Sequence, residues 1–206
     1  MKTKKMLYKD WKVYYKKILK DFDFKIENDI ESARLLDDIL SEKNIFPLSK
    51  LKNLLKEKKV IIFGAGTSLT NSLKSFKKNH NMIIIAADGA TSALVENNVF
   101  PDIILTDLDG KISDQIKSNN KGSLIIIHAH GDNKDKIKKY VPKFHGKLIG
   151  TTQSDPSLFK HLFNFGGFTD GDRCVFLADH FKSKQILLLG FDYKKIGRYS
   201  FSTNKK

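Results

Sequence analysis

The sequence predicts an α/β protein with an open, doubly wound, mostly parallel sheet of the Rossmann-like type and a helical N-terminal extension. Its 206 residues, 40% of them hydrophobic, suffice for one domain with a substantial core. From residue 60 onward, short apolar runs recur without alternating polar residues, as is typical of strands buried on both faces. Helix-sized stretches separate several of these runs, and alternating strands and helices indicate a parallel sheet flanked by helices.

The predicted division of the chain is a helical extension over residues 1–57 and a catalytic α/β domain over residues 58–206. In the extension, apolar residues recur at helical spacing in two successive stretches. Asn28 and Glu31 have the spacing of a capping box that opens the second helix. We identify no chemistry in this extension.

The strands and helices of the second part are predicted from the apolar runs and the spaces between them. The predicted strands are Val60–Phe63, Met82–Ala87, Asp102–Leu105, Leu124–Ile127, Lys147–Ile149 and Ile186–Leu189. The predicted helices between them are Leu69–Lys78, Ser92–Asn97, Lys134–Tyr140 and Asp172–Lys182.

Charge and composition limit the partners. The net charge is +14, but the lysines are dispersed and no basic cluster is interleaved with aromatic residues, so we predict no nucleic-acid partner. A positive field also attracts a polyphosphate such as ATP. The longest apolar runs, about six residues, fall short of the ~20 that span a bilayer, and no signal peptide is visible. We therefore expect a cytoplasmic protein without a membrane partner. Its oligomeric state stays open, and a homo-oligomer is possible.

Small, acidic and hydroxyl residues follow nearly every predicted strand. In open α/β sheets, ligands bind outside the carboxyl ends of the strands. We therefore expect these turns to converge on one site. The turns are Gly64–Ser68, Ala87–Thr91, Thr106–Gly110, His128–Asn133, Gly150–Gln153 and Gly190–Asp192.

The first of these turns, Gly64–Ser68, suits a phosphate group. Its glycines allow close approach of the backbone, and the following helix offers free N–H groups. It is not a Walker A loop, because no Gly-Lys-Ser/Thr follows. A purely structural role in a tight strand-to-helix corner is equally compatible with the sequence.

Asp107 and Asp109 give the sharper signal. If the chain stays extended, two carboxylates at positions i and i+2 face the same way and repel unless a cation binds them. Mg²⁺ prefers such hard oxygen ligands together with substrate phosphates. Asp88, at the end of the preceding strand, is expected to join the cluster. The alternative is a simple turn at Asp109-Gly110.

His128 and His130 alternate at a strand end and are expected to point the same way. With Asp132 they could form a transition-metal site, but no paired-cysteine or HExxH spacing supports zinc. Contacts to substrate or phosphate are the favoured interpretation, and a structural role for one of the two histidines stays open.

The glycine-rich loop Asn164–Arg173 leads into a predicted helix. Thr169 or Asp170 can cap that helix. Arg173 lies in the first turn, against the helix dipole, which indicates a specific role. It could clamp a phosphate or pair with Asp172.

The same loop carries Phe165 and Phe168. These rings could stack on a flat substrate, and core packing of the loop is an equally good interpretation.

Taken in order, these motifs resemble the archaeal 6-hydroxymethyl-7,8-dihydropterin diphosphokinase family. The segments that carry the resemblance are Ala86–Leu94, Pro101–Gly110, His128–Asn133, Gly150–Gln153 and Asn164–Arg173. The similarity extends from Val60 to about Thr203. The two acidic motifs are also similar to those of thiamine pyrophosphokinase.

The resemblance implies transfer of a pyrophosphoryl group from ATP to a pterin alcohol. The hydroxymethyl oxygen would attack the β-phosphorus and AMP would leave, in the biosynthesis of a tetrahydromethanopterin- or folate-type cofactor. Mg²⁺ is the implied cofactor, on Asp107 and Asp109 with Asp88 nearby. One of Asp88, His128 or Asp132 would take the alcohol proton.

The candidate residues fall into two groups. The candidate catalytic residues are Asp88, Asp107, Asp109, His128, Asp132 and Arg173. The candidate nucleotide- or substrate-binding residues are Gly64, Gly66, Thr67, Ser68, Gly89, Thr91, His130, Gly131, Asn133, Thr151, Thr152, Gln153, Asn164, Phe165, Gly166, Gly167, Phe168, Thr169, Asp170 and Asp192.

Three alternatives stay open at this point. The same chemistry could act on thiamine. A dinucleotide-dependent oxidoreductase is suggested by Gly64, Gly66 and Asp88, but Leu69 occupies the third glycine position and the acidic pair would be unexplained. A non-catalytic nucleotide-binding module would bind ATP without releasing AMP.

Overall fold

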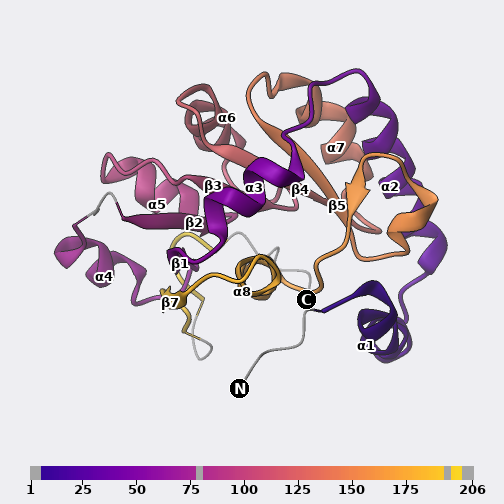
Figure 1. The fold of residues 1–206 in the computed structure, drawn as a ribbon, viewed down its shortest axis with the longest axis horizontal. Helices are drawn as coiled ribbons and strands as arrows, with labels where there is room; N and C mark the ends of the chain where they lie inside the picture. Colours follow the sequence, from indigo (N-terminus) through magenta and orange to yellow (C-terminus); the bar gives the residue numbers. More distant parts are fainter. Residues whose placement is uncertain (1–5, 78–80, 193–195, 201–206) are drawn as a thin grey trace.

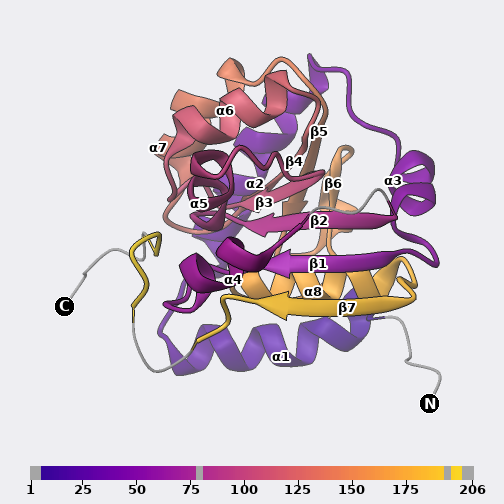
Figure 2. The same cartoon turned by 90° about the vertical axis from the view of Figure 1, so that its left-hand side faces the viewer.

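The computed structural model of this protein describes residues 6–77, 81–192 and 196–200. Seven parallel strands form one sheet in the order β6-β5-β4-β3-β2-β1-β7 (Figures 1 and 2). The strands are β1 (Lys59–Phe63), β2 (Met82–Ala87), β3 (Ile103–Thr106), β4 (Leu124–Ala129), β5 (Leu148–Thr152), β6 (Leu162–Phe163) and β7 (Gln185–Leu189). The predicted parallel α/β sheet is thereby confirmed.

Helices cover both faces of this sheet. The α-helices are α1 (Tyr8–Asp21), α2 (Ile26–Ser41), α3 (Leu48–Leu55), α4 (Leu69–Ser75), α5 (Ala90–Glu96), α6 (Ile112–Asn120), α7 (Lys134–Tyr140) and α8 (Asp170–His180). Two short 3₁₀ turns are η1 (Val141–Lys143) and η2 (Pro156–Leu158).

The sheet separates two hydrophobic cores, because successive side chains of a strand point to opposite faces. In β1, Ile61 and Phe63 join the core under α2, α4, α5 and α7. Val60 and Ile62 join the core under α3 and α8. Every interior strand therefore needs apolar residues at consecutive positions, which explains the runs of isoleucine and leucine.

The strand order creates a switch point beside β1. From β1 to β6 the chain adds strands in one direction, and α8 then returns along the opposite face to place β7 on the free side of β1. In Figure 2, the arrows of β1, β2 and β7 point the same way. Ligands of open α/β sheets bind at the carboxyl edge near such a reversal.

Two elements lie outside the predicted pattern. The fully buried residues of α6 are polar and include Asp114, Gln115 and Ser118. Only Ile112 and Ile116 pack on the core as apolar residues, too few to mark a helix by periodicity. Strand β6 has only two residues.

The predicted capping box at Asn28 and Glu31 is wrong, because α2 begins two residues before Asn28 and has no side-chain cap.

The N-terminal helices pack directly on the sheet. Ala33, Leu36 and Leu40 of α2 belong to one core, and Leu51 of α3 belongs to the other. Trp11 of α1 is buried and donates its indole N–H to the carbonyl of Gln153 at 3.0 Å. These contacts tie residues before 57 to the α/β part, while the division at 57 stays a prediction.

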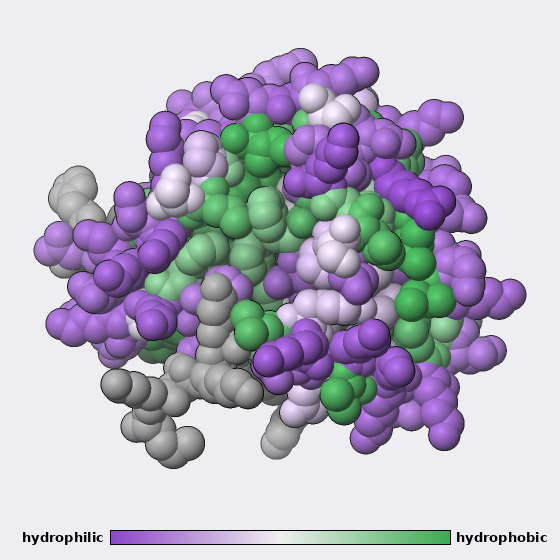
Figure 3. All heavy atoms as spheres, turned by 45° about the vertical axis from the view of Figure 1, so that its right-hand side comes forward, coloured by the Kyte–Doolittle hydropathy of each residue, from purple (hydrophilic) through white to green (hydrophobic). Residues whose placement is uncertain are grey.

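On the face drawn in Figure 3, hydrophilic residues dominate the periphery and hydrophobic residues gather across the middle. Among the described residues, no helix combines the length and apolar composition that a membrane crossing needs.

We expect helix α1 to unfold together with the sheet. Trp11 is the single tryptophan, so intrinsic fluorescence reports on α1 while far-UV circular dichroism reports on the whole fold. In a urea titration the two transitions should coincide, as in a two-state domain. A fluorescence transition at clearly lower urea would show instead that α1 is an independently unfolding unit.

Candidate active site

Three carboxylates meet at the carboxyl edge of the sheet. Asp88 follows β2, Asp107 follows β3 and Asp170 begins α8. Each offers an oxygen atom, and these atoms all lie within 4.8 Å of one another. They come from three segments distant in sequence, so the fold and not local spacing brings them together.

Strand pairing fixes the first two of these residues. β2 and β3 are adjacent, and the amide of Asp88 donates to the carbonyl of Leu105 at 2.8 Å. Asp88 itself has a positive φ of 35°. Gly110 keeps the space beside its carboxylate free, because a Cβ there would lie 2.9 Å from Asp88 Oδ2.

Asp88 is held by a buried polar network. Its Oδ1 accepts hydrogen bonds from Thr106 Oγ1 at 2.5 Å and Gln115 Nε2 at 2.9 Å. Burial, followed by the neighbouring charge of Asp107, raises the pKa of Asp88 to about 7. The buried polar face of α6, which carries Gln115, therefore supports the site.

Asp107 differs from its neighbour in charge state. Burial acts to raise its pKa, but nearby His130 and Arg173 outweigh burial and lower the pKa of Asp107. His130 Nε2 lies 3.4 Å from Asp107 Oδ2, an ion-pair contact. Asp107 Oδ1 is buried and has no hydrogen-bond partner among the described residues. Asp107 is thus a charged carboxylate with an unused ligand atom.

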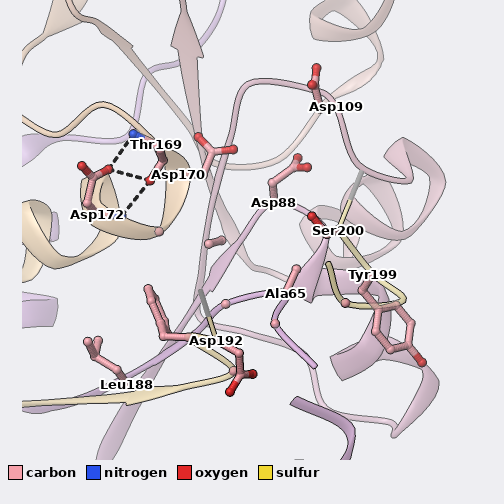
Figure 4. A pocket seen from close by; sticks show the side chains of 18 of the residues that line it. Ala65, Asp88, Asp109, Thr169, Asp170, Asp172, Leu188, Asp192, Tyr199 and Ser200 are labelled. Atoms are coloured by element: carbon pink, nitrogen blue, oxygen red, sulfur yellow. Dashed lines mark hydrogen bonds between the residues drawn. The ribbon is translucent and has the colours of Figure 1, made fainter. Parts of the chain in front are cut away.

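Asp170 and Arg173 form a buried pair. Arg173 Nη1 donates to Asp170 Oδ1 at 2.9 Å, and Nη2 lies 3.5 Å from Gln153 Oε1. Burial and the charge of Asp107 still raise the pKa of Asp170 well above its ordinary value. Of the two roles suggested for Arg173, pairing with Asp172 is wrong, because its partner is Asp170. Asp172 and Thr169 instead form the capping box of α8, drawn as dashed lines in Figure 4.

The donor set fits a divalent cation. Three carboxylates, one of them with an orphaned oxygen and two with raised pKa values, are poor neighbours for one another without added positive charge. Oxygen-only ligands suit Mg²⁺. The residues present therefore match the expected metal in chemistry, with Asp170 in the group.

Asp109 is not part of this close group. Its carboxylate pairs with Lys136 of α7, and Figure 4 shows it pointing away from Asp88 and Asp170. The reason lies in the backbone, because Leu108 has a φ of 70° and the chain does not stay extended between Asp107 and Asp109.

The two histidines have different environments. His130 Nδ1 lies 2.8 Å from Asp132 Oδ1. Although burial lowers the pKa of His130, its contacts with Asp107 and Asp132 raise it to about 9, so it is a cation at neutral pH. Burial and the charge of Arg173 keep the pKa of His128 well below its ordinary value. Neutral His128 Nδ1 lies 3.0 Å from Thr151 Oγ1.

Two large cavities flank the carboxylates. The first, about 790 Å³, lies at the ends of β1, β2 and β7 and is drawn in Figure 4. The second, about 360 Å³, lies between α2, the turn after β4 and the start of α8. Both are lined by Asp107, Thr169 and Asp170, so the carboxylate group stands where the two cavities adjoin.

Most predicted site residues line a cavity. The first cavity has Gly64, Gly66, Asp88, Gly89, Asp107, Asp109, Thr169, Asp170 and Asp192. The second has Asp107, His130, Gly131, Asp132, Gln153, Phe168, Thr169, Asp170 and Arg173. A small space of about 10 Å³ is lined by His128, Thr151, Thr152, Asn164, Phe165, Gly166, Gly167 and Arg173. Four line none of these: Thr67, Ser68, Thr91 and Asn133.

Several of these residues support the site from behind. Asn133 is buried and donates to the carbonyls of Asp107 at 3.0 Å and His128 at 2.7 Å, which ties the ends of β3 and β4 together. The Ser68 amide donates to Asp192 Oδ2 at 2.6 Å, so this amide of the first turn already has an anionic partner. Phe165 packs against Phe181 in the core.

Helix α2 and the segment before it contribute residues that the sequence interpretation misses. Phe24, Lys25, Asn28 and Asp29 line the second cavity. One signal was available: Asp29 occupies the same helical stripe as the core residues of α2, where a charged side chain is unusual.

Comparison with known proteins identifies the family of this chain. The family model described as "6-hydroxymethylpterin diphosphokinase MptE-like" matches residues 34–197. The chain belongs to this family. As a member of the MptE-like family it is an enzyme of the pyrophosphokinase, or diphosphotransferase, class.

Three archaeal relatives of this MptE-like chain are described as 6-hydroxymethyl-7,8-dihydropterin pyrophosphokinase. The protein from Methanocaldococcus jannaschii is 47% identical over 193 residues, 90% of this chain and 79% of the relative. That from Pyrococcus furiosus is 42% identical over 198 residues, 95% and 82%. That from Methanothermobacter thermautotrophicus is 45% identical over 192 residues, 92% and 81%.

Metal stabilisation should depend on pH. The folded-state pKa of Asp88 is raised to about 7, and that of Asp170 is raised well above its ordinary value. The stability that these groups contribute without metal is therefore greatest at low pH and is lost as pH rises, for Asp88 through about 7. A cation must displace those protons. We expect millimolar Mg²⁺ to raise the melting temperature of EDTA-treated protein more at pH 8 than at pH 5. An equal rise at both pH values would contradict this, and Asp88→Asn should shrink the difference.

Proposed function

We propose that this protein transfers the diphosphoryl group of ATP to the hydroxymethyl group of 6-hydroxymethyl-7,8-dihydropterin, with release of AMP and with Mg²⁺ as cofactor. The observation that carries the proposal is the position of Asp107 and Asp170 where two cavities adjoin, in a member of the MptE-like family. Two substrates need two sites that share the reacting region. The names of the three relatives support the pterin as acceptor. The product would serve tetrahydromethanopterin- or folate-type cofactor biosynthesis.

The larger cavity suits the nucleotide. It lies at the switch point of the sheet and is bordered by the backbone of Gly64 and Gly66. No side chain fits at Gly66, where a Cβ would lie 2.5 Å from the carbonyl oxygen of Gly190. The turn therefore needs glycine because the chain after β7 packs against it, and the assignment of the nucleotide rests on the position of the cavity at the switch point.

Asp88, Asp107 and Asp170 would hold Mg²⁺ by their carboxylate oxygens. When bound, Mg²⁺ supplies Lewis-acid polarisation and neutralises phosphate charge. The proposal assigns the metal to this trio in place of the Asp107–Asp109 pair expected from the sequence, since Asp109 is engaged with Lys136.

Two positively charged side chains lie where they could stabilise the negative charge of the phosphate groups. Arg173 is buried, borders the second cavity and has an Nε atom without a hydrogen-bond partner among the described residues. His130 lines the same cavity and is protonated at neutral pH. Fixed positive groups at a transferring phosphoryl group stabilise the transition state, which is the main catalytic contribution in such reactions.

Position and basicity together narrow the choice among the three residues that could take the alcohol proton. His128 lines neither large cavity, whereas Asp88 lines the first and Asp132 the second. His130 contacts Asp132 and lowers its pKa to about 2, which makes Asp132 a weak base. His128 is therefore the least suited of the three candidates, because it borders neither large cavity. Asp132 is also disfavoured, because its low pKa makes it a weak base.

The test of the proposed function is AMP release from ATP and Mg²⁺ with 6-hydroxymethyl-7,8-dihydropterin, with thiamine in parallel. AMP with the pterin alone is the expected result. AMP with thiamine alone would preserve the reaction type and overturn the acceptor. ATP binding without AMP from either alcohol would favour a non-catalytic nucleotide-binding module.

Single carboxamide variants should rank the carboxylates. We expect Asp107→Asn and Asp170→Asn each to lower kcat by about 100-fold or more, as loss of one transition-state-stabilising group typically does. Asp109→Asn should lose far less, because its partner is Lys136. Steady-state rates and ATP binding by calorimetry check this. Equal losses for Asp109 and Asp170 would return Asp109 to the metal site.

A further inference from the structure

Asp29 is a buried carboxylate that faces the second cavity from helix α2. Its side chain is 2% exposed, and it lines this cavity together with Gly131 and Phe168. Among the described residues, no lysine, arginine or histidine forms an ion pair with it. A buried carboxyl group with an oxygen that lacks a hydrogen-bond donor is costly, so its retention calls for a compensating partner.

Two neutral donors hold only one of its oxygens. Asp29 Oδ2 accepts hydrogen bonds from the Tyr15 hydroxyl at 2.5 Å and from Gln153 Nε2 at 2.9 Å. Burial and this hydrogen bond raise the pKa of Tyr15, so Tyr15 keeps its proton and remains the donor. The described residues provide no hydrogen bond to Oδ1.

The surrounding contacts fix this arrangement. Gln153 Oε1 faces Arg173 Nη2 at 3.5 Å, which orients the Gln153 amide so that its Nε2 donates to Asp29. The Gln153 carbonyl in turn accepts from Trp11 at 3.0 Å. A Cβ on Gly131 would lie 3.3 Å from Asp29 Oδ1, so the missing side chain keeps the approach to this oxygen open.

The vacant acceptor matches one edge of a pterin. A 2-amino-4-oxopyrimidine ring places a ring N–H and an exocyclic amino group side by side, which makes an edge of donors only. A carboxylate has about four lone-pair sites, of which two are used on Oδ2 and two remain on Oδ1. The aminopyrimidine of thiamine sets an acceptor nitrogen beside its amino group, and that nitrogen repels a carboxylate.

Aromatic rings border the same cavity. Phe24 and Phe168 line it, with ring centroids 6.5 Å apart and planes inclined by 34°. Phe22 contacts both rings, at 5.5 Å and 5.7 Å between centroids. Phe22 and Phe24 are 58% and 49% exposed, so a flat ligand ring would cover aromatic surface that now faces water. Asp107 and Asp170 line this cavity too, so a ring held at Asp29 stays within the space that borders the carboxylate group.

We propose that Asp29 is the residue that selects the acceptor, by accepting the ring N–H and amino group of the 2-amino-4-oxopyrimidine. Tyr15 and Gln153 position its carboxylate. The inference rests on the proposed function for the identity of the acceptor, and it adds the group that recognises it.

The test compares two acceptors on three variants and the wild type. The acceptors are 6-hydroxymethyl-7,8-dihydropterin and its counterpart with a 2-oxo group in place of the 2-amino group. Asp29→Asn should raise KM for the 2-amino acceptor by about 10- to 100-fold, as loss of a hydrogen bond to a charged group does, and leave KM for ATP unchanged. It should also narrow or reverse the preference over the 2-oxo acceptor, because a carboxamide can donate to that oxygen.

Two further variants separate recognition from folding. Tyr15→Phe should raise KM for the pterin without lowering kcat, because it acts only through Asp29. Asp38→Asn, an exposed carboxylate on the same helix, should behave as wild type. An unchanged KM and an unchanged 2-amino preference in Asp29→Asn would overturn the proposal.

Equilibrium binding keeps the inference separate from catalysis. Fluorescence titration of wild type with the two pteridines, without ATP, should show at least about 10-fold tighter binding of the 2-amino compound. Equal binding of both by wild type overturns the inference even if Asp29→Asn fails to fold. A preference for the 2-amino compound without AMP release would refute the proposed function and uphold the site, whereas AMP release with equal binding would do the reverse.

Discussion

The mutual repulsion of Asp88, Asp107 and Asp170 is the constraint on which the rest of the site depends. Asp88 is buried and the other two are half-buried, and three carboxylates with oxygen atoms within 4.8 Å of one another cannot all carry charge unless positive charge lies beside them. Protons on Asp88 and Asp170 relieve part of the repulsion, and Arg173 and His130 relieve another part. The repulsion that remains is the energy that the proposed cation would recover on binding.

The fold explains why these residues meet although no local motif contains them. Adjacent parallel strands deliver Asp88 and Asp107 to the same edge. The third carboxylate arrives with α8, whose N-terminus returns over the opposite face after β6. The capping box of Thr169 and Asp172 sets where α8 begins, and so where Asp170 stands. Strand order, crossover and cap together set the position of the third carboxylate.

Sequence reasoning succeeds where a residue's position follows from the strand that precedes it. Asp88 and Asp107 are of this kind, because a buried apolar run ends immediately before each. It does less well where local spacing competes with backbone conformation. The prediction that the carboxylates of Asp107 and Asp109 face the same way assumes an extended chain. Leu108 between them has a left-handed backbone conformation, so that assumption fails. The contact of Asp170 with them depends on a crossover that no spacing encodes.

The second cavity shows the same limit from the opposite direction. Its contributions from α2 lie in a segment with ordinary helical periodicity, where Asp29 shares a stripe with Ala33, Leu36 and Leu40. An aspartate at such a position loses hydration that apolar neighbours cannot replace. Hydrogen bonds from Tyr15 and Gln153 replace part of the lost hydration, but both go to one oxygen, and the other oxygen faces a cavity. For packing alone, apolar residues in place of Asp29 and both of its partners would serve at least as well, since replacing a buried polar group together with its partners is often neutral or stabilising. The carboxylate is therefore better explained by what enters the cavity than by what holds the helix.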